Sequence, residues 1–365
     1  TAARIFARAL NCPNQQANGD CCGKPDCPIC GHDIQDSMFY SEYDSAVIGN
    51  VDNIKQLRNT FYFGYEKGYK VIETESVRKS EKGKSTSAKK RAEEFMSLLE
   101  NEKIKLIIFA TGGDFLCEML DYLDFEKIKK LKPKWMQGYS DITGIGFLFN
   151  TMLDIPSMYS QTIKDYAMRP LHKSLIDALE IVSGNEIVQS SFEYYEKEWK
   201  EENDNLYATY NLTEKVKWNN ITGEETITMT GRALGGCLDC INNFIGTKYD
   251  KVSEYIKRNK ETGTIWFLEC FEIGTSELFR TLWQMKNAGY FENCNGIIFG
   301  RPLFVREEYE NTFNSTVKEI LNDLKIPIIC DADIGHVSPQ MAIVNGAILR
   351  ITSENGKGKI ETFFS

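Results

Sequence analysis

Hydrophobic positions in the first half of the chain predict alternating strands and helices. The apolar run Ile104–Ala110 ends at Thr111-Gly112-Gly113, which is typical of a buried parallel strand followed by a tight loop. The next strand is expected at Trp135–Gly138, with a turn at Tyr139–Ser140 and a helix over Asp141–Met152. This alternation predicts an α/β fold with a doubly wound parallel sheet.

The rest of that half follows the same pattern. It predicts helices at Val51–Gly68, Ala88–Asn101 and Phe115–Tyr122, a short strand at Tyr69–Glu73 and a polar loop at Ser76–Ser87. Residues 50–165 are therefore expected to form one α/β domain, preceded by an atypical segment over residues 1–49.

The second half reads as a mixed α/β domain over residues 226–365. Strands are expected at Thr226–Ala233, Thr264–Glu269, Gly296–Phe299, Pro327–Asp331, Ala347–Thr352 and Lys359–Phe364, and helices at Cys237–Ile245, Ser276–Ala288 and Thr316–Leu324. Residues 166–225 are expected to be a linker, with a helix at Leu171–Ser183 and an acidic, aromatic flap at Ser190–Trp218.

Length and charge agree with a two-domain globular protein that binds a small molecule. A chain of 365 residues exceeds the usual size of one core. Its formal net charge is −9 and it has no stripe of Lys and Arg, which argues against nucleic-acid binding. No apolar run approaches the roughly 20 residues of a membrane span.

Cysteine usage indicates a reducing compartment, so a cytoplasmic location is expected. Eleven cysteines are scattered along the chain, as expected of free thiols rather than a disulfide framework. The opening segment offers zinc as an alternative, because it contains suitable donors at Cys22, Cys27, Cys30 and His32, although their spacing is irregular. Cys237 and Cys240 have the spacing of a redox pair but fall within a predicted helix.

His336 is the best candidate for a general base among the three histidines. It follows the predicted strand Pro327–Asp331 in a loop, directly after a glycine. Loops at strand ends are where catalytic groups collect in α/β proteins. His32 and His172 lack this setting, and a loop histidine bonded to backbone is the alternative for His336.

Ser140 is the candidate nucleophile, because it lies on the turn between a strand and a helix. A serine there presents its hydroxyl above the sheet, beside a helix N-terminus that favours a developing oxyanion. The sequence Gly138-Tyr-Ser140-Asp-Ile142 lacks the second glycine of a complete nucleophile elbow, so a helix N-cap serine is the alternative. The loop at Gly112-Gly113-Asp114 is expected to lie beside it, since successive parallel strands are usually neighbours.

Glu269 closes the apolar strand Thr264–Glu269 and therefore needs a polar partner. Orienting a catalytic imidazole would provide one, while an arginine is the alternative. Glu272 is a nearby competitor for the same role.

Six motifs in chain order make the sequence resemble the LD-carboxypeptidases, and within them the branch of the microcin C immunity peptidases. They are Gly112-Gly113-Asp114, Gly138-Tyr-Ser-Asp-Ile-Thr143, Gly231-Arg-Ala-Leu-Gly-Gly-Cys-Leu-Asp239, Phe267-Leu-Glu269, Gly300-Arg-Pro302 and Gly335-His336. The resemblance runs from about Asn50 to the end of the sequence. It implies a glutamine amidotransferase-like N-terminal domain, a C-terminal domain that carries the acid and the base, and a homodimer.

The resemblance also assigns roles, residue by residue. It implies Ser140 as nucleophile, His336 as base and Glu269 as the acid that orients it. Backbone N–H groups of Gly113 and Asp141 would form the oxyanion hole, and no metal or cofactor is needed. The expected substrate contacts are Gly112, Asp114 and Arg301.

Three functions stay open on the sequence alone. The first is a carboxypeptidase of peptidoglycan recycling that removes a terminal residue from a murein-type peptide. The second is an immunity enzyme that cleaves an aminoacyl-nucleotide amide, in which the aromatic flap would stack the base; packing alone is the alternative for these aromatic side chains. The third is a binding protein of the same fold without activity.

Overall fold

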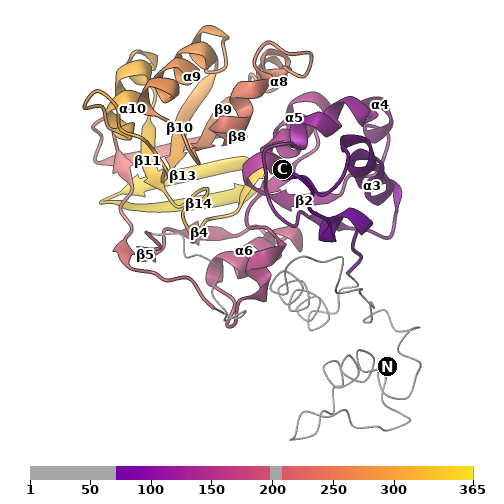
Figure 1. Cartoon of the computed structure of the whole chain (residues 1–365). Coiled ribbons are helices and arrows are strands. Elements are labelled where there is room, and N and C mark those ends of the chain that lie inside the picture. The colour runs from indigo at the N-terminus through magenta and orange to yellow at the C-terminus, as the bar shows by residue number, and fades with distance from the viewer. Residues whose placement is uncertain (1–70, 198–207, 365) are drawn as a thin grey trace, which may run out of the picture. The chain divides into compact units, whose positions relative to one another are not determined.

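The computed structural model describes residues 71–197 and 208–364, and the residues from Thr74 onward form one compact unit (Figure 1). The predicted helix Val51–Gly68 and the cysteine-rich opening, with its zinc candidates, lie outside the described residues. Of the predicted strand Tyr69–Glu73, only the last three residues are described, and they form no strand.

The smaller of the two main sheets contains the strand that leads to Ser140. Strands β1 (Leu106–Ile108), β2 (Trp135–Gly138) and β3 (Ser157–Tyr159) run parallel in this order, as expected of the predicted sheet. The strand β12 (Ile343–Asn345) pairs antiparallel with β3 at the other side. Because β12 comes from the second half of the chain, this sheet contains strands from both sides of the predicted domain boundaries at residues 165 and 226. The division into two domains at these residues stays a prediction.

Helices cover this sheet much as the sequence predicts. They are α3 (Ala88–Glu100), α4 (Phe125–Ile128) and α5 (Thr143–Leu153), with 3-10 turns η2 (Glu75–Arg78), η3 (Leu116–Tyr122), η4 (Ser140–Ile142) and η5 (Ile163–Ala167). The side chain of Ser87 caps α3 by accepting a hydrogen bond from the Lys90 N–H. The helix predicted at Phe115–Tyr122 is confirmed over Leu116–Tyr122, where it is the 3-10 helix η3.

The larger sheet has eight strands in the order β4-β14-β13-β8-β9-β10-β11-β7. Their bounds are β4 (Val188–Ser190), β7 (Asn219–Asn220), β8 (Thr226–Cys237), β9 (Thr264–Glu269), β10 (Cys294–Gly300), β11 (Ile328–Ala332), β13 (Ile348–Glu354) and β14 (Lys357–Phe363). The four strands from β8 to β11 are parallel, and the strands outside them pair antiparallel.

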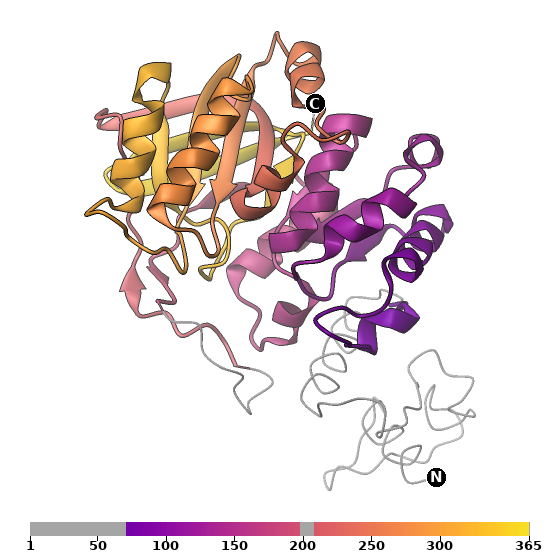
Figure 2. The same ribbon diagram turned by 45° about the horizontal axis from the view of Figure 1, so that its top comes forward.

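The two faces of this sheet bury different sets of apolar side chains. On β9, Trp266 and Leu268 point into the larger core cluster, while Ile265 and Phe267 point into a second cluster. Helices α9 (Thr275–Asn287) and α10 (Phe313–Leu321) contribute to the first of these clusters and lie over the same face, which comes forward in Figure 2. All six residues of β9 are buried, which explains its continuous apolar run.

The boundary predicted between the first strand and the first helix of this half lies further along the chain. Strand β8 runs to Cys237, four residues beyond its predicted end, so the predicted helix Cys237–Ile245 is shorter. It is made of α7 (Leu238–Ile241) and η6 (Asn242–Phe244), and α8 (Val252–Arg258) and η7 (Asn322–Leu324) complete the helices of this half.

The segment expected to be a linker and flap contributes to the larger sheet. It holds α6 (Lys173–Val182), the edge strands β4 and β7, and a two-stranded sheet of β5 (Tyr194–Tyr195) and β6 (Glu214–Lys215). Trp218 is 2% exposed and its indole Nε1 donates to Asp333 Oδ2 at 3.0 Å. This side chain is therefore part of the core and is not available to stack a ligand.

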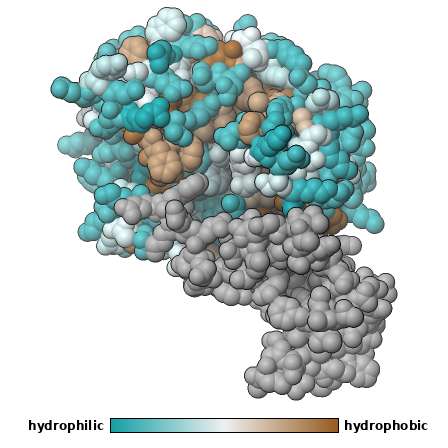
Figure 3. Space-filling model, viewed as in Figure 1, coloured by the Kyte–Doolittle hydropathy of each residue, from teal (hydrophilic) through white to brown (hydrophobic). Residues whose placement is uncertain are grey.

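Polar side chains dominate the face of the molecule shown in Figure 3, where brown apolar residues form separate patches. Among the helices of the described residues, none combines the length and the apolar character that crossing a membrane requires.

A test of the sheet packing is the substitution Gly235→Ala. Gly235 has φ +156°, and a Cβ there would lie 1.8 Å from the Phe267 carbonyl oxygen on β9. Because backbone cannot yield as a flexible side chain can, we expect the free energy of unfolding to fall by roughly 3 kcal/mol, or folding to fail. Urea unfolding measures this loss.

The matched control is Gly184→Ala. Gly184 has φ +89° and would place its Cβ in open space, so the control carries backbone strain without a clash. A loss of about 1–2 kcal/mol is expected for it. Equal losses in the two variants would show that the contact with Phe267 does not limit this position.

Candidate active site

Ser140 lies in a strained turn directly after β2. Its φ is +65°, in the left-handed region that residues other than glycine seldom adopt. The turn is tight, because a Cβ on Gly138 would lie 2.9 Å from the Ile142 side chain. This geometry presents the hydroxyl at the carboxyl edge of the sheet, as in a nucleophile elbow, although Ile142 replaces the second glycine.

His336 lies in the loop between β11 and β12 and is 3% exposed. Its ring packs against the rings of Tyr139 and Phe271, with centroid distances of 5.0 and 4.7 Å. These contacts hold the imidazole edge toward Ser140, so its orientation does not depend on hydrogen bonds alone.

Glu269 ends β9 and is completely buried. The carboxylate fits because Gly335, with φ +93°, has no side chain. A Cβ on Gly335 would lie only 2.5 Å from Glu269 Oε2. Burial acts to raise the pKa of Glu269, but the adjacent imidazole and hydrogen-bond donors outweigh it and hold the pKa below the ordinary value. The carboxylate is therefore ionised at neutral pH.

The structure brings these three side chains into one hydrogen-bonded relay. Ser140 Oγ lies 2.9 Å from His336 Nε2, and His336 Nδ1 lies 2.8 Å from Glu269 Oε2. The three residues come from two different sheets and are separated by up to 196 positions in the sequence. A hydroxyl, an imidazole and an acid in this order are the arrangement by which serine hydrolases activate their nucleophile.

The predicted oxyanion loop also lies at Ser140. A Cβ on Gly112 would come within 2.8 Å of the Ser140 Cβ, and one on Gly113 within 3.7 Å of the Asp141 carboxylate. Neither the N–H of Gly113 nor that of Asp141 has a hydrogen-bond acceptor in the described part of the chain. Two backbone donors beside the hydroxyl are thus available to an anionic oxygen.

Asp141 holds this loop in place through its carboxylate. Oδ2 accepts a hydrogen bond of 2.8 Å from the Leu116 N–H, at the start of η3. Burial raises the pKa of Asp141 to about 6, against the lowering effect of hydrogen bonds from backbone N–H groups. The carboxyl therefore changes charge close to neutral pH.

Arg301, predicted as a substrate contact, is 5% exposed and occupied by protein groups. Its guanidinium lies 2.7 Å from Asp333 Oδ1, donates to the Asp331 carbonyl at 3.2 Å and lies over the Tyr195 ring. Asp114, the other predicted side-chain contact, is exposed beside Gly113. Contact with a substrate stays a prediction for both.

Two functional candidates were missed in the sequence, Tyr159 and Tyr139. Tyr159 Oη accepts a hydrogen bond of 3.1 Å from the Ser140 N–H and donates one of 2.5 Å to Glu269 Oε1. Its strand is only three residues long, and nothing in the local pattern indicates these distant partners. Tyr139 directly precedes Ser140, so its position in the sequence could have indicated its contact with His336.

The cysteine pair lies beside the relay with both thiols free. Cys237 is opposite Glu269 in the pairing of β8 with β9, and Cys240 Sγ lies 3.7 Å from the Ser140 carbonyl. A redox function for this pair stays a prediction. Within the described residues, no group of three or more His, Cys, Asp or Glu side chains is arranged to hold a metal ion.

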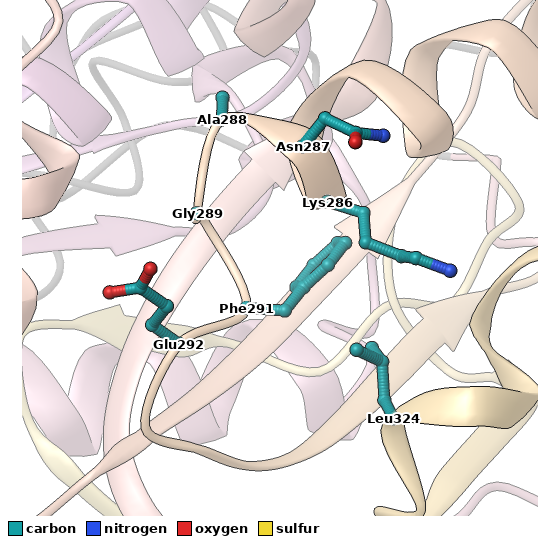
Figure 4. A pocket seen from close by; sticks show the side chains of 7 residues that line it. All are labelled: Lys286, Asn287, Ala288, Gly289, Phe291, Glu292 and Leu324. Atoms are coloured by element: carbon teal, nitrogen blue, oxygen red, sulfur yellow. The ribbon is translucent and has the colours of Figure 1, made fainter.

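A separate surface hollow of about 280 Å³ lies at the end of α9 (Figure 4). It is lined by Lys286, Asn287, Ala288, Gly289, Phe291, Glu292 and Leu324. The end of α9 leads to the amino end of β10, whereas Glu269 lies at the carboxyl end of β9. The hollow is therefore at the opposite edge of the sheet from the relay and takes no part in it.

The fold and the relay together define an α/β protein with a hydrogen-bonded Ser-His-Glu site, and sequence comparison gives the family. The sequence matches the LD-carboxypeptidase N-terminal domain over residues 46–160 and the LD-carboxypeptidase C-terminal domain over residues 230–351. The chain belongs to the LD-carboxypeptidase family, as its motifs indicate. The microcin C7 self-immunity protein MccF of Escherichia coli is 26% identical over 316 residues, which cover 82% of this chain and 87% of MccF.

Solved structures share the fold at lower identity. MccF in complex with glutamyl sulfamoyl guanosine aligns with a TM-score of 0.70 and 20% identity, covering 87% of this chain and 93% of that one. A muramoyltetrapeptide carboxypeptidase from Oxalobacter formigenes aligns with a TM-score of 0.66 and 19% identity, covering 84% of this chain and 94% of that one. These likenesses confirm the predicted α/β architecture.

Titration of Asp141 provides a test of the loop. Because its pKa is about 6, the carboxyl is protonated below that pH and accepts a weaker hydrogen bond from Leu116. We expect the amide chemical shift of Leu116 to titrate with a midpoint near pH 6. Nuclear magnetic resonance measures the shift, and Asp141→Asn should abolish the titration.

Asp114→Asn is the control for this titration. Asp114 is exposed and its negative charge adds to the raised pKa of Asp141. The titration should persist in this variant with a slightly lower midpoint. If the Leu116 shift lost its pH dependence in Asp114→Asn, the titrating group would be Asp114 and the prediction for Asp141 would be wrong.

Proposed function

We propose that the protein is a serine hydrolase that cleaves an amide bond in a small peptide-like substrate. The observation that carries the proposal is the continuous relay from Ser140 Oγ through His336 to Glu269, at 2.9 and 2.8 Å. Membership of the LD-carboxypeptidase family supports a peptidase or related hydrolase.

In the proposed first step, His336 Nε2 takes the hydroxyl proton as Ser140 Oγ attacks the substrate carbonyl. Glu269 keeps the imidazole in the tautomer that has its proton on Nδ1 and stabilises the imidazolium that forms. The burial of Glu269 strengthens this effect, because little water screens the ion pair.

The tetrahedral intermediate places negative charge on the former carbonyl oxygen. The backbone N–H groups of Gly113 and Asp141 are the proposed donors to this oxygen, and one such donor typically contributes about 3 kcal/mol. The imidazolium then protonates the leaving amine, and water attacks the acyl-serine with His336 again acting as base.

A murein-type peptide is the first proposed substrate. The muramoyltetrapeptide carboxypeptidase of the same fold acts on that class, as its name states. A cytoplasmic enzyme that removes a terminal residue from such peptides would serve in peptidoglycan recycling. A homodimer is proposed with it, on the resemblance of the motifs.

The aminoacyl-nucleotide amide is a second candidate, favoured by the similarity to MccF over 82% of this chain. One MccF structure holds glutamyl sulfamoyl guanosine. The buried Trp218 weakens this candidate in the form predicted from the sequence, because it removes one aromatic ring from the expected stacking surface. The flap still contains Tyr194 and Tyr195, but both are half-buried and the Tyr195 ring lies against the Arg301 guanidinium.

The substitution Ser140→Ala tests the proposed reaction with both substrate classes. We expect hydrolysis to fall by at least about 10³-fold, since the nucleophile is lost while the oxyanion donors stay. Mass spectrometry of the products distinguishes released D-alanine from a released nucleotide sulfamate. Ser183→Ala, at the exposed end of α6, should retain full activity.

No product from either substrate with the wild-type protein would refute hydrolysis of these two classes and favour a binding function. Equal turnover by Ser140→Ala and the wild type would refute this serine as nucleophile. Either result can be read only if the variants unfold at the wild-type temperature, which circular dichroism checks.

The substitution Glu269→Gln tests the acid independently. A glutamine amide can donate to His336 Nδ1 and so favour the tautomer that has its proton on Nε2, where the base must be free. We expect kcat to fall by roughly 10²–10⁴-fold with a small change in KM. Glu272→Gln, the neighbouring carboxylate that is more than half exposed, should leave kcat unchanged.

A further inference from the structure

We infer that Tyr159 is a positioning residue that ties the nucleophile turn to the catalytic acid. The inference rests on the proposed hydrolase function and deepens it. Its hydroxyl closes a ring of hydrogen bonds that starts and ends at Ser140. The ring runs from the Ser140 N–H to Tyr159 Oη, on to Glu269, then to His336 and back to Ser140 Oγ.

Both hydrogen bonds of Tyr159 have a defined direction. The Ser140 N–H can only donate, so Tyr159 Oη accepts at 3.1 Å. The hydroxyl proton is then free to point at Glu269 Oε1, 2.5 Å away. Burial and the nearby carboxylate raise the pKa of Tyr159 well above its ordinary value, so the hydroxyl keeps this proton at neutral pH.

The first bond acts on the strained backbone of the nucleophile. Ser140 has φ +65°, which persists only where the surroundings hold it. Tyr159 is 4% exposed and lies on β3, which pairs with β2 immediately before the turn. Its ring also contacts Phe267 on β9 at 5.5 Å, so the hydroxyl position is fixed by packing from both sheets.

The second bond acts on the acid. Each oxygen of the buried Glu269 carboxylate has its own partner, Tyr159 for Oε1 and His336 for Oε2. Removing the tyrosine donor would leave Oε1 buried without it, and the remaining neighbour of the carboxylate is the thiol of Cys237, a weak donor. The carboxylate could then rotate, and its second oxygen would compete for the imidazole proton.

The test is Tyr159→Phe, which keeps the ring and removes both bonds. The probe is a fluorophosphonate that reacts with activated serines, and the readout is its labelling rate from pH 5 to 9. We expect the maximal rate to fall by about 10–100-fold. We also expect the midpoint of the pH profile to move upward, because Glu269 without a neutral donor stabilises the imidazolium more strongly.

A matched control is Tyr255→Phe. Tyr255 is equally buried and its hydroxyl accepts a hydrogen bond from Asn150 Nδ2 at 3.3 Å, outside the ring. This variant should lose some stability and keep the wild-type pH profile. A merely structural role of Tyr159 would make the two variants alike, and that result overturns the inference.

Amide exchange at Ser140 provides a second measurement that needs no activity. The N–H is protected in the wild type by Tyr159 Oη, so exchange should be at least about tenfold faster in Tyr159→Phe. Unchanged exchange overturns the inference even if labelling slows. A wild-type protein that the fluorophosphonate does not label contradicts the proposed function, and the exchange measurement still decides for Tyr159.

Discussion

The burial of one negative charge, on Glu269, is the constraint on which the site depends. The carboxylate is completely buried at the end of a strand whose other residues are all buried too. An ionised carboxylate in such surroundings is stable only if donors satisfy it. Here the donors are His336 and Tyr159, one on each side of the group. His336 comes from the loop after β11 and Tyr159 from the smaller sheet. The contacts that stabilise the buried charge therefore also bring the residues of the relay together.

The same constraint explains the glycine before His336. A Cβ on Gly335 would lie 2.5 Å from Glu269 Oε2, so the missing side chain leaves the space that the carboxylate fills. Gly300, at the end of β10, meets a different limit, because a Cβ there would lie 2.1 Å from the Ile334 carbonyl oxygen and 3.0 Å from the Glu269 Cβ. The motif at Gly335 is therefore a packing requirement of the acid as much as it is a signature of the family, whereas the motif at Gly300 lets two backbone segments approach each other.

The sequence predicted the elements that single stretches define and missed those that depend on distant contacts. Strands Trp135–Gly138 and Thr264–Glu269 were confirmed to the residue, because each is a short stretch that begins with apolar or β-branched residues and ends at a glycine or a charged residue. The proximity of Ser140, His336 and Glu269 is also as expected, but that expectation came from the order of motifs and not from local pattern.

Tyr159 was missed because its partners lie 19 and 110 positions away, and β12 because three buried residues do not reveal which sheet they join. Trp218 is an error of the opposite kind, because an aromatic residue in an acidic segment was expected to be exposed and is buried. A Cβ on Gly358 would lie 2.1 Å from its ring, which shows how closely the indole is packed.

Because Ser140 follows a strand of one sheet and Glu269 ends a strand of the other, the relay depends on how those sheets meet. A shift of 1 Å between β2 and β9 would lengthen the bonds of 2.9 and 2.8 Å beyond useful geometry. Strand β12 and helix α5 oppose such a shift. The first follows the His336 loop and pairs with β3, and the second packs against both β3 and β8. Asn150 on α5 adds a buried hydrogen bond of 3.1 Å to Asn345 on β12. The elements that bind the two sheets together thus follow Ser140 and His336 directly in the sequence, so the path of the chain that builds the relay also keeps it rigid.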